Sequence, residues 1–326
     1  MNNIRKSNLP LHVFSWSNMK IQQILRRLLL GNRYKHQYTC HPKFNLKRHK
    51  KCYEIAWDNE FIANIKCAEI LQNTFKGSCF TVATGPSLNN LDLSKISKID
   101  TISLNCAIKK FIASNQTPTH CIIVDRRIFE NEWECVEASI LSGANCFFSY
   151  VGLSKICERD PSLLRHGNIY LIESTSRKFG IPRPSIEESK KFFRLDPDFF
   201  LDPELLDYCR SIGFSTSLEK GLFSGKTVAT WATQLAFALG YKNNFIIGMD
   251  LGGTGKKHFY AEENNGVPDF IKDYEPYIRA CFELARKVCD KNGWGIYNLS
   301  PKSTLPNEIV KKISLEEALK IAHNSH

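Results

Sequence analysis

Short apolar segments alternate with helical patterns from residue 79 onward, and this alternation limits the fold more than any other feature. Each segment is almost continuously apolar, which is typical of strands buried on both faces of a parallel sheet. The clearest helical patterns cover residues 227–239 and 276–291. The predicted fold class is therefore α/β, with a Rossmann-like, mostly parallel sheet. The predicted strands are 79–84, 101–105, 121–125, 146–150, 169–173, 245–250 and 295–299.

One long segment, from about residue 174 to 220, interrupts this alternation. It is charged and contains several prolines, and a long insertion in a compact domain is usually a lid or a binding loop. We predict two parts for the chain. Residues 1–77 form a basic N-terminal arm with helices, and residues 78–326 form the Rossmann-like domain with its lid insertion at about 174–220.

The net charge of +11 is concentrated near the N-terminus. Residues 1–52 contain twelve Lys or Arg and no acidic residue, whereas the remainder is nearly neutral. Residues 16–30 have helical spacing, with an apolar stripe at Ile21, Ile24, Leu25 and Leu28. A basic amphipathic helix suits an anionic membrane surface. A packing helix followed by a solvated basic loop is an equally open interpretation, and nucleic acid is not expected as a partner because the arm lacks interleaved aromatic residues.

The cysteines indicate a reducing compartment. Most of the twelve stand singly within apolar runs, which is typical of buried free thiols rather than of a disulfide framework. The sequence has no apolar run of eighteen residues and no signal-peptide pattern. We therefore expect a cytoplasmic protein.

The turn after the first predicted strand has the composition of an anion site. It contains Thr84, Gly85, Pro86 and Ser87. Glycine permits a tight turn, and proline at the first helical position leaves free amides at a helix N-terminus. An ordinary strand-to-helix turn is the alternative.

Polar residues also follow the next two strands. Asn105 ends the second strand and Asp125 ends the third. Ligands of open α/β sheets bind beyond the carboxyl ends of the strands. An amide or a carboxylate at these positions would bind a ribose or a base, and a helix-capping role is an open alternative.

Two further turns complete the set of candidate residues at the carboxyl edge of the predicted sheet. Ser224 and Gly225 precede a helix, and Gly248 and Asp250 join a strand to a glycine-rich loop. Two glycine-rich turns and two helix N-termini predict a site for a nucleotide-linked phosphate.

The order of these segments resembles that of two related families. The chain is similar to bacterial CMP-sialic acid sialyltransferases with an N-terminal Gly-Pro-Ser-Leu turn, and more closely to the WaaZ-type lipopolysaccharide core proteins, which are considered Kdo transferases. The resemblance covers roughly residues 78–310 and matches the insertion poorly. It rests on 83–88 (ATGPSL), Asn105, 224–225 (SG), 236–241 (AFALGY), 248–251 (GMDL), 259–260 (FY) and 296–301 (IYNLSP).

The resemblance implies a metal-independent, inverting glycosyltransferase on a GT-A-like sheet, with no cofactor. It implies a CMP-activated acidic sugar as donor and a lipid-linked oligosaccharide as acceptor, at the cytosolic face of the inner membrane. By similarity, residues 85–87, Asn105 and Ser224 hold the donor. Tyr260 occupies the position of a family tyrosine that hydrogen-bonds the leaving phosphate, where hydroxyl and amide donors stabilise the growing charge without a metal.

Two departures from the sialyltransferases favour a Kdo donor. Those enzymes have asparagine where this chain has Asp125, and their catalytic histidine has no counterpart here. An acceptor hydroxyl needs a general base, for which Asp273 and Glu275 are candidates by position and His258 by chemistry. Each has an open structural alternative, as a helix cap or a loop residue.

The leading hypothesis is transfer of Kdo from CMP-Kdo to a lipopolysaccharide inner-core sugar. One alternative is the same chemistry with CMP-sialic acid or another nonulosonate. A third, of a different class, is a non-catalytic binding protein associated with a membrane or a nucleic acid.

Overall fold

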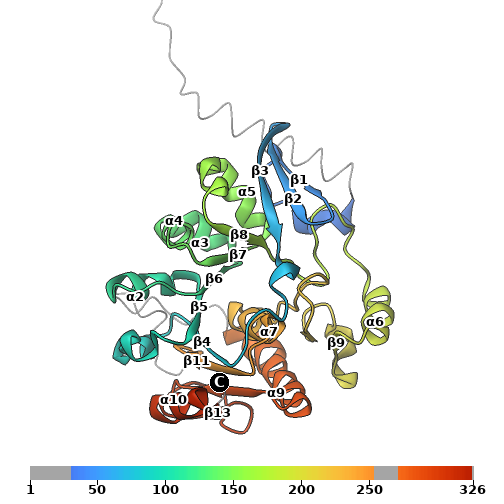
Figure 1. Ribbon diagram of the computed structural model, residues 1–326. Coiled ribbons are helices and arrows are strands. Elements are labelled where there is room, and N and C mark those ends of the chain that lie inside the picture. The colour runs from blue at the N-terminus through green and yellow to red at the C-terminus, as the bar shows by residue number, and fades with distance from the viewer. Residues whose placement is uncertain (1–30, 253–270, 325–326) are drawn as a thin grey trace, which may run out of the picture.

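An eleven-stranded sheet runs through the protein, with helices on both of its faces (Figure 1). The structure is a computed structural model that describes residues 31–252 and 271–324. The strand order is β1-β2-β3-β8-β7-β6-β5-β4-β11-β12-β13. Its strands are β1 Phe44–Arg48, β2 Cys52–Trp57, β3 Glu60–Cys67, β4 Ser78–Val82, β5 Asp100–Leu104, β6 His120–Ile123, β7 Asn145–Phe148, β8 Asn168–Leu171, β11 Asn243–Ile247, β12 Gly295–Asn298 and β13 Lys311–Lys312.

All seven predicted strands are present, as β4 to β8, β11 and β12, with bounds displaced by at most three residues. The two clearest helical patterns are also present, as α7 and α9. The α-helices are α2 Ile108–Ala113, α3 Arg126–Asn131, α4 Trp133–Leu141, α5 Tyr150–Arg159, α6 Ile186–Leu195, α7 Val228–Leu239, α8 Ile271–Asp273, α9 Ala280–Asn292 and α10 Leu315–His323. The short 3-10 helices are η1 Asn32–Gln37, η2 Ala68–Leu71, η3 Pro86–Asn90, η4 Leu93–Ile96, η5 Asn105–Ala107, η6 Pro161–Arg165 and η7 Pro203–Tyr208, and η8 Tyr274–Arg279 is a π-helix.

Each face of the sheet has its own core. Along β4, Phe80 and Val82 belong to the cluster that includes residues of α2, α4, α5 and α10, whereas Cys79 belongs to the cluster with α7 and α9. Successive side chains of a strand point to opposite faces, so a strand covered on both faces is apolar at every position. This explains the continuous apolar segments in the sequence.

Residues 44–67 form an antiparallel meander that the sequence analysis did not predict. The strands β1, β2 and β3 extend the sheet, and β3 pairs in parallel with β8. Asp58 and Asn59 form the turn between β2 and β3, both with positive φ (55° and 68°), as a two-residue type I′ turn requires. The predicted amphipathic helix at 16–30 lies outside the described residues.

The chain reverses direction across the sheet between β4 and β11. From β4 it moves outward through β5, β6 and β7 to β8, and then α7 returns it to β11 on the other side of β4. Such a reversal leaves a crevice beyond the carboxyl ends of the two central strands. The expected position of this crevice is beside the turns that follow Val82 and Ile247.

The cysteines and the helices agree with the sequence-based expectations. All twelve cysteines are unpaired, and eleven of them are buried. Among the described residues, no helix combines the length and the apolar character needed to cross a bilayer.

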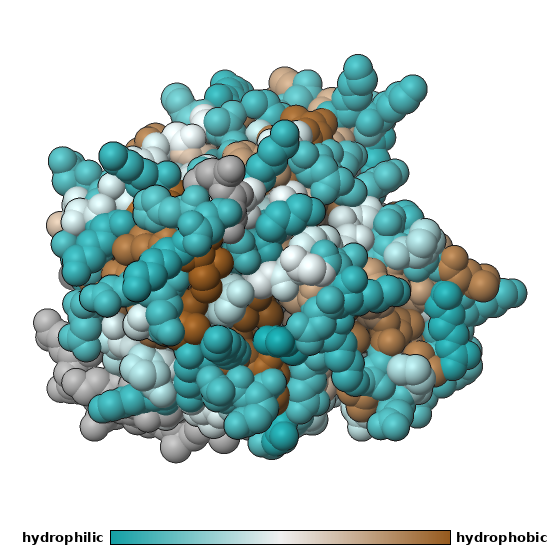
Figure 2. Space-filling view, turned by 60° about the horizontal axis from the view of Figure 1, so that its bottom comes forward, coloured by the Kyte–Doolittle hydropathy of each residue, from teal (hydrophilic) through white to brown (hydrophobic). Residues whose placement is uncertain are grey.

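The insertion at about 174–220 contains α6, a two-stranded sheet of β9 Phe199–Phe200 and β10 Phe214–Ser215, and a small separate core. Two large side chains of α6, Phe192 and Leu195, are exposed. Figure 2 shows apolar side chains on the right-hand side of the molecule, where α6 and β9 lie in Figure 1. The insertion thus has its own packing, and its function as a lid stays a prediction.

Candidate functional site

The turns after β4 and β11 are hydrogen-bonded to each other at the chain reversal. The Gly85 amide donates to the Gly248 carbonyl (2.8 Å), and the Ser87 amide donates to Asp250 Oδ2 (2.8 Å). A Cβ at Gly85 would overlap the Gly248 carbonyl oxygen and lie 2.7 Å from Asp250 Oδ2. Gly248 itself has φ +73°. Both glycines are therefore required by the close approach of the two turns.

This geometry corrects one expectation about the first turn. Pro86 was expected to leave free amides for an anion, but the amides of Gly85, Ser87 and Leu88 are already used within the protein. The carboxylate of Asp250 also occupies the position that an anion would take. The first turn therefore binds a carboxylate of the protein itself.

A third loop, after β12, joins the two turns. The Ser300 hydroxyl lies 3.0 Å from the Ser87 hydroxyl and accepts the amide of Met249 (3.0 Å). The Ser300 amide donates to Asn298 Oδ1 (2.9 Å). Ser300 and Asn298 were absent from the predicted site, although the segment 296–301 that contains them carried part of the family resemblance. The resemblance of this segment was thus the sequence signal that could have identified Ser300 and Asn298.

Three buried polar atoms at this edge lack a hydrogen-bond partner among the described residues. They are Asp250 Oδ1, Asn105 Oδ1 and Asn298 Nδ2. Asp250 is only 3% exposed, and Asn105 holds a left-handed backbone with φ +49°. An unsatisfied buried polar atom is costly, and a bound ligand is one way to satisfy it. Two acceptors and one donor are thus available at the ends of three strands.

Asp125 follows β6 and caps α3. Its Oδ1 accepts the Arg127 amide (2.9 Å), and its Oδ2 pairs with the Arg127 guanidinium (2.7 Å). Burial raises the pKa of Asp125, but the hydrogen bonds and charge of Arg127 outweigh burial and leave the pKa below its usual value. The structure therefore shows the capping contact, and a role in ligand binding stays a prediction.

Ser224 and Gly225 lie before the N-terminus of α7. Thr227 caps this helix, and the Thr230 hydroxyl donates to the Ser224 carbonyl (2.9 Å). Because α7 leads to the amino end of β11, its own N-terminus lies toward the carboxyl edge of the sheet. The Ser224 turn is thus at the predicted edge.

The candidate bases differ in their surroundings. Glu275 pairs with Arg279 (3.3 Å), and its side chain is 67% exposed. Asp273 is half-buried and makes no capping hydrogen bond to the π-helix that follows it. The neighbouring Tyr274 hydroxyl donates to the Thr304 carbonyl (3.0 Å), and the Thr304 amide donates to the Asp250 carbonyl (3.1 Å).

These contacts anchor the start of the π-helix beside the Asp250 loop, and π-helical turns are frequent at functional sites. The residue after Asp273 is thus linked to the Asp250 loop through Thr304, whereas Glu275 has an ion-pair role on the surface. The other two candidates, His258 and Tyr260, lie outside the described residues.

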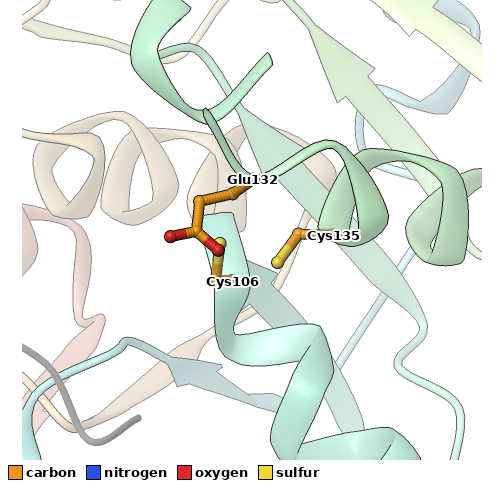
Figure 3. A group of neighbouring side chains, drawn as sticks. All are labelled: Cys106, Glu132 and Cys135. Carbon is orange, nitrogen blue, oxygen red and sulfur yellow. The ribbon is translucent and has the colours of Figure 1, made fainter. Parts of the chain in front are cut away.

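One side-chain cluster near the site has metal-ligand chemistry. Ligand atoms of Cys106, Glu132 and Cys135 lie within 4.8 Å of one another and point toward a common space (Figure 3). However, Glu132 is paired with Lys109 (2.8 Å), whose ammonium already supplies a positive charge there. The hydrogen bond with Cys106, together with burial, raises the pKa of Cys135 well above its usual value. Both thiols belong to the core, and we interpret the cluster as packing.

The Asp-Pro-Asp segment in the insertion is held by a lysine. Lys220 Nζ lies 2.7 Å from a carboxylate oxygen of Asp196 and 2.7 Å from one of Asp198. This bridge connects the segment to the end of the insertion and gives the two carboxylates a structural function.

Comparison with known proteins identifies a family. A sequence model described as "3-deoxy-D-manno-octulosonic acid transferase WaaZ" matches residues 61–316, from β3 into α10. A "Probable 3-deoxy-manno-octulosonic acid transferase" of Salmonella typhimurium (strain LT2) is 24% identical over 263 residues, which are 79% of this chain and 94% of that protein. A protein of the same name from Escherichia coli (strain K12) is 21% identical over 260 residues, 76% of this chain and 86% of that protein.

Solved structures of two glycosyltransferases are distantly similar. The MAf glycosyltransferase of Magnetospirillum magneticum AMB-1 has 15% identity and a TM-score of 0.45, with 78% of this chain and 38% of that chain covered. The sialyltransferase CstII of Campylobacter jejuni, in complex with cytidine-5'-monophosphate, has 12% identity and a TM-score of 0.42, with 72% and 84% covered.

Proposed function

The chain belongs to the WaaZ family of 3-deoxy-D-manno-octulosonic acid transferases, and we propose that it transfers 3-deoxy-D-manno-octulosonic acid (Kdo) from CMP-Kdo to a sugar of the lipopolysaccharide inner core. The protein is a glycosyltransferase. The observation that supports the proposed donor best is the set of polar atoms, without partners among the described residues, where β5, β11 and β12 end.

These atoms suit the nucleoside part of the donor. Asp250 Oδ1 and Asn105 Oδ1 are acceptors, which match the ribose hydroxyls and the amino group of cytosine. The negative charge of Asp250 disfavours a phosphate in direct contact with it. In our proposal the nucleoside therefore lies in the crevice, and its phosphate lies farther along the edge.

The departing phosphate needs hydrogen-bond donors. As the bond between the anomeric carbon of Kdo and the phosphate oxygen breaks, its electron pair moves to the phosphate while the sugar becomes oxocarbenium-like. The Tyr260 hydroxyl, by family resemblance, and the Ser224 hydroxyl at the same edge are the donors that we propose for this charge. Such stabilisation supports a transfer that needs no catalytic metal.

The acceptor hydroxyl attacks the opposite face of the anomeric carbon and loses its proton to a general base. We propose Asp273 for this role. It is half-buried, makes no capping bond, and precedes Tyr274, whose hydroxyl is linked through Thr304 to the Asp250 carbonyl. Glu275 is less suitable because its carboxylate is exposed and engaged with Arg279.

The proposed acceptor is linked to a lipid, which requires access to a membrane. The basic segment 1–52 supports a peripheral location at the cytosolic face of the inner membrane, because an anionic surface attracts clustered Lys and Arg. Eleven buried unpaired thiols agree with a reducing compartment.

Thermal denaturation with CMP, CDP, UDP and GDP tests the donor class, first with EDTA and then with Mn²⁺. Selective stabilisation by CMP that Mn²⁺ does not change supports the proposal, and transfer from CMP-Kdo but not from CMP-sialic acid to truncated core saccharides establishes the donor. Stabilisation by UDP or GDP, or an absolute need for Mn²⁺, would contradict the mechanism. If no nucleotide binds, a non-catalytic role becomes the better explanation.

A further inference from the structure

Three arginines gather beyond the carboxyl end of β8. Arg177 and Arg183 lie in the segment that follows this strand, and Arg210, later in the same insertion, lies close enough for its charge to act on Arg183. The Ser176 hydroxyl donates to the Arg210 carbonyl (3.0 Å), and Arg210 Nη1 donates to the Pro184 carbonyl (3.2 Å). These contacts join the segment that contains Arg177 and Arg183 to the segment around Arg210.

None of the three arginines forms an ion pair with a carboxylate in the part of the chain that the structure describes. Nearby arginines do so: Arg33 pairs with Glu188 (2.7 Å) and Arg48 with Glu173 (2.8 Å). Glu173, the closest acidic residue in sequence to Arg177, also accepts the amide of Phe179 (2.8 Å). Within the described ranges, no ion pair therefore compensates the positive charge of the cluster.

Polar atoms in the same region also lack partners. Arg183 Nε, Thr175 Oγ1 and His36 Nδ1 are buried and have no hydrogen-bond partner among the described residues. Burial, followed by the charges of Arg177 and Arg210, lowers the pKa of Arg183 to about 10. Like charges held together at a partly buried position favour a bound anion, which removes both the repulsion and the unsatisfied donors.

We propose that Arg177, Arg183 and Arg210 bind a phosphate or carboxylate group of the acceptor saccharide. Guanidinium groups match both anions with paired N–H donors. This inference rests on the proposed function, because it assigns the acceptor half of the same site.

The position of the cluster fits an acceptor rather than the donor nucleotide. It follows β8, which is four strands from β4, so at about 4.8 Å per strand the carboxyl end of β8 lies roughly 19 Å from that of β4 along the same edge. The Ser224 turn is adjacent to the cluster, since the Gly225 amide donates to the Ser211 carbonyl (3.0 Å). A donor whose nucleoside lies in the crevice and an acceptor whose anionic group binds the arginines would therefore meet between these two positions.

Steady-state kinetics of Arg183→Gln and Arg210→Gln provide the test, with Arg165→Gln as the matched control. Arg165 precedes the opposite, amino end of β8 and donates to the Ile62 carbonyl. We expect the two cluster variants to raise the KM for the acceptor at least tenfold and to change the KM for CMP-Kdo less than twofold. With an acceptor that lacks its phosphate and carboxylate groups, the difference between variants and wild type should disappear. An unchanged acceptor KM in folded variants, or an increase confined to the donor KM, would overturn the inference.

A binding measurement separates this inference from the proposed function. Titration calorimetry of the full chain with inorganic phosphate, and separately with free Kdo as a carboxylate probe, does not depend on catalysis. Binding of either probe by the wild type and by Arg165→Gln, with at least tenfold weaker binding by Arg183→Gln, supports the cluster even if CMP does not bind. Equal binding by all three proteins contradicts the cluster even if the transferase activity is established.

Discussion

The backbone amide of Ser87 donates a hydrogen bond to Asp250 Oδ2 over 2.8 Å, across 163 positions of the sequence. This contact joins the turns after β4 and β11, the two strands between which the chain reverses direction. It uses one oxygen of a buried carboxylate and leaves the other, Oδ1, without a partner among the described residues. In our proposal, Asp250 uses one oxygen for structure and offers the other to the ligand.

Asp250→Asn should separate these two functions. The asparagine oxygen still accepts the Ser87 amide, but its NH₂ group replaces the unpartnered acceptor with a donor. We expect the Kd for CMP to rise at least about tenfold, because a mismatched buried hydrogen bond costs about 1–3 kcal/mol. Titration calorimetry measures this change. Asp202→Asn, which alters a cap of η7 and the ion pair with Lys287, is the control and should bind CMP normally.

Gly85→Ala should destabilise the protein and abolish CMP binding. The new methyl group would meet the Gly248 carbonyl and the Asp250 carboxylate, and crowding of this kind costs about 1–3 kcal/mol. Urea denaturation measures the free energy of unfolding. Gly143→Ala is the comparison, because φ is +80° and no atom lies within 4 Å. It should lose about 1–2 kcal/mol through backbone strain alone and keep its affinity for CMP.

Asp273→Asn and Glu275→Gln form a matched pair for the general base. We expect Asp273→Asn to lower kcat at least about a hundredfold with unchanged CMP affinity, because the acceptor proton loses its base. Glu275→Gln should stay within about twofold of wild type, since it removes only an exposed ion pair with Arg279. The reverse order of effects would assign the base to Glu275, and equal small effects would exclude both residues.

The stability of the protein should fall as the pH is lowered from 6.5 toward 4. Burial lowers the pKa of His120 to about 4, although the charge of Asp100 opposes this shift. The unfolded chain therefore binds a proton in this range that the folded protein does not, which costs up to about 1.4 kcal/mol per pH unit. Urea denaturation at pH 7, 6 and 5 should show a smaller pH dependence for His120→Gln than for wild type. Parallel pH profiles would rule out His120 as the source.

The sequence predicted the strands of the sheet but missed its antiparallel extension. The seven predicted strands were recognised because burial on two faces makes them continuously apolar. The strands β1 to β3 carry polar and basic residues such as Lys47 and Arg48, so their charge was interpreted as an arm. The pair Asp58-Asn59 between two short runs was the available hairpin signal, because these residue types tolerate the positive φ of a type I′ turn.

The sequence predicted which residues belong to the candidate site. It did not predict which hydrogen bonds these residues form with one another. Glycines and polar residues after strands indicate which positions can face a ligand, since the carboxyl ends of parallel strands meet at one edge. Whether the amides of Gly85 and Ser87 are free cannot be read from the sequence, because their acceptors are Gly248 and Asp250, which are distant in the chain.

The sequence alone determined the α/β class, the central strands, the unpaired thiols and the family, because each depends on local patterning or on the order of short motifs. Only the tertiary structure decided which oxygen of Asp250 remains without a partner, that Asp125 caps α3, and that three arginines from two segments gather beyond β8. The physical reason is that a hydrogen bond or an uncompensated charge depends on which groups meet in space. Sequence patterns specify what each segment can do, and the packing of the segments selects which of these contacts are made.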